Sequence, residues 1–236
     1  MSKPFRFKQF QIHHDRCAMK VGTDGVLLGA TASAESPKTI LDIGTGTGLV
    51  ALMLAQRFPE ARIEAVEIDQ SAFLQATENV TESPWAERIG LWHKPFQDFA
   101  QECNRKFDLI ASNPPFFPNH LLSPDPQRNL ALHHGSLDFE ALASGVAKLL
   151  AHPGAFWLVL PPAQMSDMQD RLRNKGLFPF FLHEIADKPQ KKPHRYIQGF
   201  SFSEVGFESR KVFVKDENGM YSKEYSKLLR DFLIIF

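Results

Sequence analysis

Between Thr39 and Lys175, short apolar runs of strand length alternate with segments of helical periodicity, and this alternation allows very few folds. The predicted strands are Thr39–Ile43, Arg62–Ile68, Arg88–His93, Phe107–Ser112 and Ala155–Leu160. The predicted helices are Leu49–Arg57, a segment from the N-cap Ser71 to Ser83, Phe139–Leu150 with Pro153-Gly154 as its stop, and Gln164–Lys175. Elements in this order are typical of a parallel sheet whose crossover helices cover both faces. The sequence therefore predicts a doubly wound α/β fold.

The order of elements changes after Gly176, where Phe178–Ile185 and Gln198–Val205 resemble two strands without a helix between them. Strands that lack a crossover helix pair antiparallel. We therefore expect a mostly parallel, seven-stranded sheet with an antiparallel edge strand. Lys211–Lys215 is predicted to add a short strand and Tyr221–Phe236 to form a terminal helix.

The two ends of the chain differ in their predicted roles. Residues 1–38 are expected to form a basic N-terminal extension that contacts the substrate, with Gly22–Gly29 as a turn entering a helix. Residues 39–236 are expected to form the main domain.

Composition excludes several classes of protein. The 27 Lys and Arg residues balance 27 Asp and Glu residues, so any binding of nucleic acid must come from a local patch. Two cysteines are too few for a disulfide framework or a four-Cys zinc site. No apolar run approaches the roughly 20 residues that cross a bilayer. We therefore expect a soluble, cytoplasmic protein.

The first candidate site is a glycine turn, D-x-G-x-G-x-G, formed by Asp42, Gly44, Gly46 and Gly48 between the first strand and the first helix. Glycines there let a ligand approach the backbone at a helix N-terminus. A dinucleotide turn prefers G-x-G-x-x-G and binds a pyrophosphate. The acid before the glycines suits a cationic ligand better, such as S-adenosylmethionine (AdoMet), which carries an ammonium and a sulfonium. A tight turn without a ligand is the alternative.

An acid at the end of the second strand is the second candidate. Glu67, about 20 residues after the turn, can accept hydrogen bonds from the two ribose hydroxyls of a nucleoside ligand. Asp69 follows closely but stands where a helix N-cap is expected. The alternative is an exposed strand end without a ligand. After the glycine turn, we favour Glu67 as the ribose ligand.

The third candidate, Asn113-Pro114-Pro115-Phe116, follows the fourth strand, at an edge where parallel sheets bind ligands. The prolines stiffen the turn, so the Asn113 side-chain oxygen and a backbone carbonyl can face one site. Two acceptors suit a planar –NH2 group and leave its nitrogen lone pair free to attack a methyl group. Phe116 offers a face for stacking a base or amide. A purely structural Asn-Pro-Pro turn is the alternative.

These three motifs together resemble the class I AdoMet-dependent methyltransferases, which have a Rossmann-like fold. Their N-P-P-[FY] subset methylates planar amino or amide nitrogens. Further stretches are similar to the bacterial tRNA adenine-N6 methyltransferases that act on adenine 37 of tRNA1(Val), over nearly the whole chain. These stretches are Phe7–Phe10, Met19–Gly25, Leu52–Gln56, Ser83–Ile89, Pro193–Arg195 and Tyr221–Ser222.

The resemblance implies AdoMet as methyl donor, S-adenosylhomocysteine as product, and a monomer that acts on tRNA. It also implies that Lys20, Gly22, Thr23 and Asn113 contact the cofactor. The family has an Asp after the third strand, where this chain places Pro95; Asp98 or a backbone carbonyl is expected to replace it. Guanine N2 of rRNA or a protein glutamine amide remain alternative substrates, and a catalytically idle RNA-binding module is a third alternative.

Two basic segments are candidates for RNA binding. Residues 1–20 contain five basic residues against one acid, and residues 187–195 contain four against one. The predicted phosphate contacts are Arg6, Lys8, Arg16, Lys188, Lys191, Lys192 and Arg195. If both segments flank Asn113 they form a phosphate-binding rim, whereas the alternative is two solvated charge runs. The target base would be splayed out of a tRNA loop and stacked on an aromatic ring.

Metal binding is not expected from the sequence. His13-His14 and His133-His134 are adjacent pairs, without the i, i+4 spacing of helical zinc ligands. Methyl transfer from a sulfonium is an in-line displacement in which positioning is the main catalytic effect.

Overall fold

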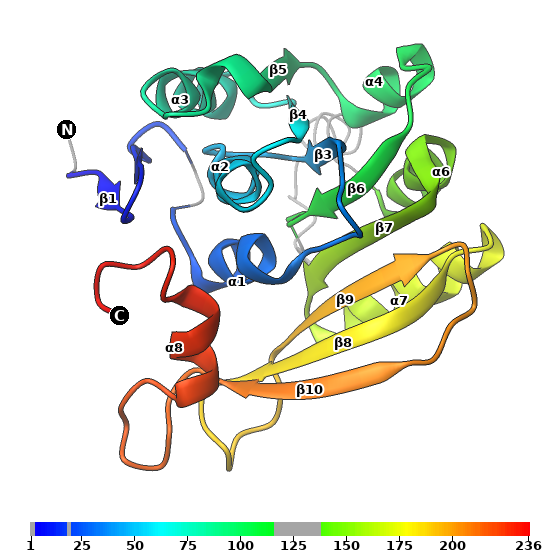
Figure 1. Cartoon of the computed structure of the whole chain (residues 1–236). Helices are drawn as coiled ribbons and strands as arrows, with labels where there is room; N and C mark the ends of the chain where they lie inside the picture. The colour runs from blue at the N-terminus through cyan, green and yellow to red at the C-terminus, as the bar shows by residue number, and fades with distance from the viewer. Residues whose placement is uncertain (1–2, 18–19, 116–137) are drawn as a thin grey trace, which may run out of the picture.

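The computed structural model describes residues 3–17, 20–115 and 138–236, and its centre is one twisted sheet (Figure 1). Its eight strands lie in the order β10-β8-β9-β7-β6-β3-β4-β5. The strands are β3 Thr39–Ile43, β4 Arg62–Glu67, β5 Ile89–His93, β6 Phe107–Ser112, β7 Leu150–Leu160, β8 Phe178–Ala186, β9 Arg195–Ser201 and β10 Glu208–Phe213. In the described part of the chain, β9 alone runs antiparallel to its neighbours in this sheet.

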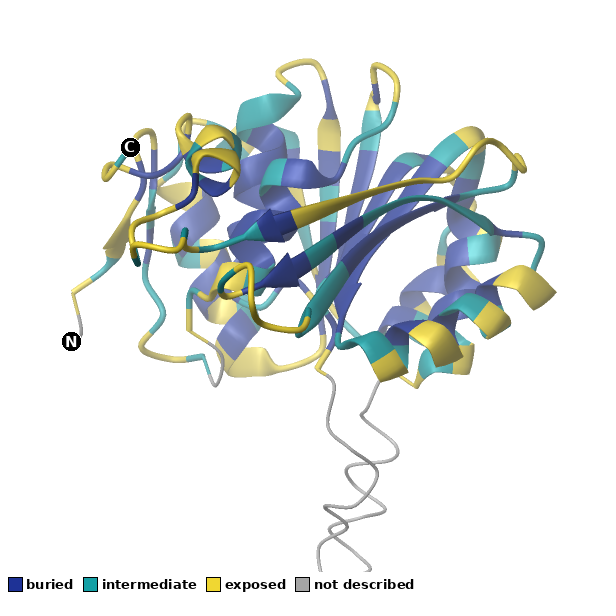
Figure 2. Cartoon of the chain, turned by 90° about the horizontal axis from the view of Figure 1, so that it is seen from below, coloured by how far each residue is buried: buried dark blue, intermediate teal, exposed yellow. Residues whose placement is uncertain are grey.

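Helices cover both faces of the sheet. One face carries α1 Thr23–Thr31, α2 Leu49–Arg57, α3 Gln70–Thr81 and α8 Lys223–Leu229, and the other carries α4 Phe96–Glu102, α6 Phe139–Leu149 and α7 Pro162–Asn174. In β3, Ile40 packs into the first core cluster, while Leu41 and Ile43 pack into the second. Figure 2 shows the resulting pattern, with buried residues in the sheet and on the inner sides of the helices. The doubly wound, mostly parallel α/β fold is thereby confirmed.

The antiparallel strand differs from the prediction in its position. We expected an antiparallel strand at the edge of the sheet, but the edge strand is β10, which pairs parallel with β8. The antiparallel strand is β9, which lies between β7 and β8. The sheet has eight strands rather than seven. The parallel pairing is possible because the chain crosses over after β9 and returns to the far side of β8.

Several predicted boundaries also shift. Pro153-Gly154 does not follow a helix but lies inside β7, which starts at Leu150. The N-cap of α3 is not Ser71 but Asp69, which confirms the cap position expected for Asp69, because its side chain accepts a hydrogen bond from the Ala72 backbone N–H. Helix α4 was not predicted. The terminal helix spans only Lys223–Leu229, and Gly22 is the N-cap of α1 rather than the start of a turn.

The N-terminal segment packs against the main domain. Strands β1 Phe5–Arg6 and β2 Gln11–Ile12 form a small antiparallel sheet. Phe7, Phe10 and Ile12 are buried in the same hydrophobic cluster as α1 and α2. The Lys8 backbone N–H donates to the Phe232 carbonyl, so the two ends of the chain lie side by side (Figure 1).

Candidate active site

Three of the predicted motifs meet at the carboxyl edge of the sheet. Strands β6, β3 and β4 are neighbours, and Ile43 lies in register with Ser112 on one side and Val66 on the other. The next residues along the three strands are Gly44, Asn113 and Glu67. The register therefore brings the glycine turn, the acid and the Asn-Pro-Pro turn together, at the edge where parallel sheets bind ligands.

The glycine turn has an open face. Gly44, Gly46 and Gly48 have φ angles of +70°, +58° and +83°, in the left-handed region that favours glycine. A Cβ atom added at Gly44 or Gly46 would meet no heavy atom within 4 Å, so the space in front of both is free. Gly48 is the N-cap of α2 and faces Ala76, whose Cβ would lie 3.6 Å from an added Cβ. A ligand can therefore lie against the backbone at the start of α2.

Asp42 supports this turn from beneath. Its side chain is buried, and Oδ2 accepts hydrogen bonds from the Thr45 hydroxyl at 2.6 Å and from the Ala51 backbone N–H at 3.1 Å. Burial raises the pKa of the Asp42 carboxyl to about 7, against these hydrogen bonds. The structure thus shows Asp42 joining the turn to the first residues of α2.

Glu67 links the turn to the end of β4. It is 8% exposed; Oε2 accepts from the Gly46 backbone N–H at 2.8 Å, and Oε1 accepts from the Asp69 backbone N–H at 2.9 Å. Each carboxylate oxygen has a second lone pair, so the group can accept further hydrogen bonds from hydroxyls in the open space. These two hydrogen bonds therefore fix the orientation of the carboxylate.

Asn113 lies against the first helix. It is half-buried, Pro114 is buried and Pro115 is exposed. A Cβ atom added at Gly25 would come within 3.6 Å of Asn113 Nδ2, so α1 passes directly beside this side chain. Phe116, like the pair His133-His134, lies outside the described residues.

The other residues expected at the cofactor lie in two places. Lys20, Gly22 and Thr23 are exposed at the start of α1, on the segment that leads to Gly25 and Asn113. Asp98 is exposed in the first turn of α4, which follows β5 at the same edge of the sheet, with Pro95 as the N-cap.

The loop between β8 and β9 also lies at this edge, because β8 runs parallel to the central strands. It carries Lys188, which is half-buried, and Lys191 and Lys192, which are exposed. At its end, Arg195 Nε donates to Asp24 Oδ2 at 2.7 Å, and both side chains are about one quarter exposed. This ion pair, whose acid the sequence analysis missed, attaches the basic loop to α1, next to Gly25.

The structure separates the basic residues of the N-terminal segment. Arg16 reaches Glu78 of α3, with 3.5 Å between the guanidinium and the carboxylate. Lys8 Nζ instead donates to the carbonyls of Arg230 and Phe236 at the C-terminus. Arg6 is exposed on β1. These three residues therefore do not form one continuous rim with the loop.

Asn79 is a site-supporting residue that the sequence analysis did not identify. Its side chain is 1% exposed; Nδ2 donates to the carbonyls of Thr47 and His13 at 2.8 and 2.9 Å, and Oδ1 accepts from the His13 backbone N–H at 2.8 Å. It thus joins the glycine turn, α3 and the N-terminal segment. A polar residue inside an amphipathic helix gives no sequence signal of this role.

Comparison with known proteins identifies relatives that are similar to this chain over nearly its whole length. Residues 18–164 match the family described as "Methyltransferase small domain". Proteins named tRNA1(Val) (adenine(37)-N6)-methyltransferase from Bacteroides fragilis and Histophilus somni are 46% and 43% identical, and the alignments cover 99% and 98% of both chains. The equivalent protein of Pedobacter heparinus is 40% identical over 100% of both chains.

Solved structures show the same fold at low identity. A predicted O-methyltransferase from Agrobacterium tumefaciens has a TM-score of 0.64 at 16% identity, covering 89% of this chain and 96% of its own. A glycopeptide N-methyltransferase in complex with S-adenosylmethionine has a TM-score of 0.54 at 13% identity, covering 78% of this chain and 100% of its own. Within the described residues, none of the helices has the length and apolar character required to cross a membrane.

Proposed function

The chain belongs to the methyltransferase small domain family, and we propose that it transfers the methyl group of AdoMet to N6 of adenine 37 in tRNA1(Val). The observation that carries this proposal is the register of β6, β3 and β4, which places an open glycine turn, Glu67 and Asn113 side by side. Relatives that are 40–46% identical over nearly their full length support the tRNA substrate.

The residues at the edge fit AdoMet. The space in front of Gly44 and Gly46 accepts the amino acid part of a ligand against the backbone, and Glu67 accepts the ribose hydroxyls. Bound AdoMet supplies an electrophilic methyl group. Gly25 of α1 lies beside Asn113, and Lys20, Gly22 and Thr23 precede it as further cofactor contacts in this proposal.

Asn113 and Pro114 orient the nitrogen that is methylated. The Asn113 Oδ1 atom accepts one hydrogen of the adenine amino group, and the Pro114 carbonyl accepts the other. With both hydrogens engaged, the nitrogen lone pair points out of the base plane. This contact strengthens in the transition state, because the N–H groups become more acidic as the new N–C bond forms.

The tRNA is expected to reach the site across the loop between β8 and β9. Lys188, Lys191 and Lys192 would contact phosphates, since they lie at the same edge as Asn113. Arg195 is engaged by Asp24, so its main role in this proposal is to hold the loop against α1. A tRNA substrate also supports a cytoplasmic location for the enzyme.

Incubation with labelled AdoMet and bulk RNA from a strain that lacks the enzyme tests this function. We expect label in one tRNA, recovered as N6-methyladenosine after digestion to nucleosides. Label in N2-methylguanosine or in protein would show that the substrate is guanine or a protein rather than adenine. The absence of AdoMet binding in calorimetry would indicate a catalytically idle RNA-binding module.

Asn113 variants test the orienting step. Asn113→Ala should lower turnover by about 10²–10³ and leave the affinity for AdoMet nearly unchanged. Asn113→Asp keeps an acceptor oxygen and should retain much more activity. Turnover of Asn113→Ala at the wild-type rate would exclude this turn from the chemistry.

A further inference from the structure

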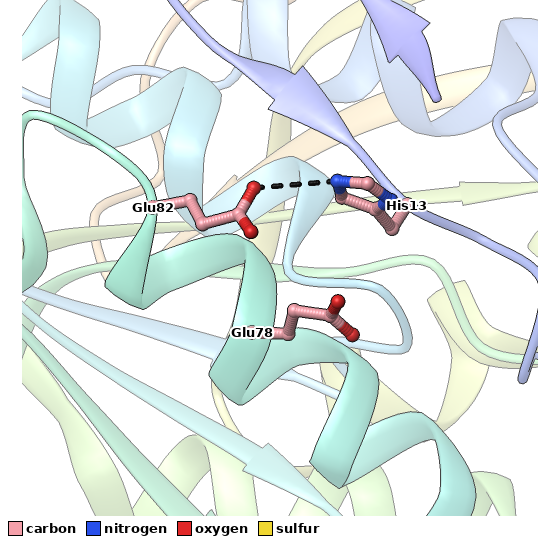
Figure 3. Close-up of side chains that lie close together, drawn as sticks. All are labelled: His13, Glu78 and Glu82. Carbon is pink, nitrogen blue, oxygen red and sulfur yellow. Dashed lines mark ion pairs between the residues drawn. The ribbon is translucent and has the colours of Figure 1, made fainter. Parts of the chain in front are cut away.

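A cluster of potential metal ligands lies between the N-terminal segment and α3. The His13 Nε2 atom and one carboxylate oxygen each of Glu78 and Glu82 lie within 4.8 Å of one another. His13 Nε2 is 3.3 Å from Glu82 Oε2. Figure 3 shows both carboxylates on the side of α3 that faces the imidazole ring.

The three side chains are held before any ion binds. Glu78 of α3 and the C-cap residue Glu82 are four residues apart, and the helical conformation of Glu82 places both carboxylates on the same side. The Asn79 side chain bonds both the N–H and the carbonyl of His13, so the backbone that carries the imidazole is fixed. Gln75 Nε2 donates to Glu78 at 2.9 Å and Gln11 Nε2 donates to Glu82 at 3.2 Å. Such second contacts orient metal-binding carboxylates.

The two carboxylates of the cluster have different partners. Glu78 faces the guanidinium of Arg16, which is 3.5 Å away and half exposed. Glu82 faces the His13 imidazole, which is a cation only when it is protonated. A divalent cation would pair with both carboxylates at once, while the neutral imidazole contributes a nitrogen ligand and Arg16 turns toward solvent.

We propose that His13, Glu78 and Glu82 bind one Zn²⁺ ion, with water completing its coordination. An imidazole with two carboxylates favours zinc over magnesium or calcium, which prefer oxygen ligands alone. Bonds of about 2.0–2.2 Å require the ligand atoms to move together by small side-chain rotations. The ion links the N-terminal segment to α3, and Asn79 connects this zinc site to Thr47 of the glycine turn. Its role is structural and distinct from methyl transfer.

Titration calorimetry of the chelator-treated, full-length protein with ZnCl2 tests the site. We expect saturable one-to-one binding in the wild type, and its loss in His13→Ala and in Glu82→Gln. The matched controls are His152→Ala and Glu87→Gln, which remove an exposed imidazole and an exposed carboxylate outside the cluster and should bind as the wild type does.

A second measurement separates binding from folding. Zinc should raise the thermal unfolding midpoint of the wild type and of both controls, but not of the two cluster variants, and the same concentration of MgCl2 should raise none of them. Glu82 is the exposed C-cap residue of α3, so Glu82→Gln is expected to fold. The proposal is overturned if the wild type binds no zinc, or if His13→Ala binds it as tightly as the wild type. If a cluster variant is less stable but the wild type binds no zinc, the cluster stabilises the fold only through the ion pair between His13 and Glu82.

Discussion

Replacing Glu67 with Gln separates its support of the glycine turn from its binding of ribose. The carboxylate accepts the backbone N–H groups of Gly46 and Asp69 with one oxygen each. An amide offers one acceptor oxygen and one donor nitrogen, so it can accept only one of these two N–H groups. The other donor then faces the NH2 group of a side chain that is only 8% exposed, so water replaces the lost partner poorly.

The energy of a charge-assisted hydrogen bond sets the expected loss of stability and the expected loss of AdoMet affinity. A hydrogen bond to a charged group contributes about 1.5–3 kcal/mol, so Glu67→Gln should lower the free energy of unfolding by about that amount. If Glu67 also holds the ribose, the loss of one charge-assisted bond to AdoMet should raise the Kd about 10- to 100-fold. Urea unfolding measures the first effect and titration calorimetry with AdoMet measures the second.

Asp69→Asn is the matched control, because it makes the same change of carboxylate to amide at the same strand end. Asp69 caps α3 through the Ala72 N–H, and Asn caps helices about as well as Asp. Stability and AdoMet affinity should therefore both stay near wild type. If Glu67→Gln unfolds at a lower urea concentration yet binds AdoMet with the wild-type Kd, then Glu67 only supports the glycine turn and its assignment to the ribose is refuted.

Two further predictions concern the basic loop and the buried acid. Replacing Lys191 and Lys192 with Ala should weaken tRNA binding and reduce its dependence on log salt by about one unit of slope per lost contact, without changing AdoMet affinity; an unaltered slope would identify a solvated loop. Because burial raises the pKa of Asp42 to about 7, the folded state holds this proton more tightly than the unfolded state. The free energy of unfolding should therefore fall by up to about 4 kcal/mol as pH rises from about 4 to about 7. Urea unfolding across this range should show this fall as a change in the free energy of unfolding of the wild type relative to that of Asp42→Asn. Burial lowers the pKa of His183 to about 4, so His183 makes the free energy of unfolding rise with pH. Both proteins contain His183, so its contribution cancels in the comparison. Parallel curves for the two proteins would refute the Asp42 assignment.

The elements that the sequence predicted well are those in which most residues are buried. The bounds of β3, α2 and β6 agree with the prediction at both ends. Strands buried on both faces require continuous apolar runs, and the glycine turn and the Asn-Pro-Pro turn end two of these runs sharply. Their neighbouring positions at the sheet edge follow from the parallel order alone.

Elements whose limits depend on distant contacts were missed or misplaced. Helix α4 has seven residues, and it is held by Phe96, Phe99 and Ala100 in the core beneath it, so its sequence shows little helical periodicity. Strand β7 continues through Pro153 because its start pairs with Phe107 of β6, which a helix-stop pattern cannot indicate. The role of Lys8 depends on carbonyls at the opposite end of the chain.

The position of the basic loop shows how one reversed strand affects the site. If β8 had followed β7 as an antiparallel neighbour, the turn after β8 would lie at the amino edge, away from Asn113. In the structure, β9 takes that place and β8 keeps the direction of the central strands, so the loop after β8 returns to the carboxyl edge. The ion pair between Asp24 and Arg195 then fixes that loop to the helix beside Asn113. The antiparallel strand therefore places Lys191 and Lys192 at the same edge of the sheet as Asn113. If tRNA reaches Asn113 across this edge, these two lysines rather than Lys8 should change the salt dependence of binding.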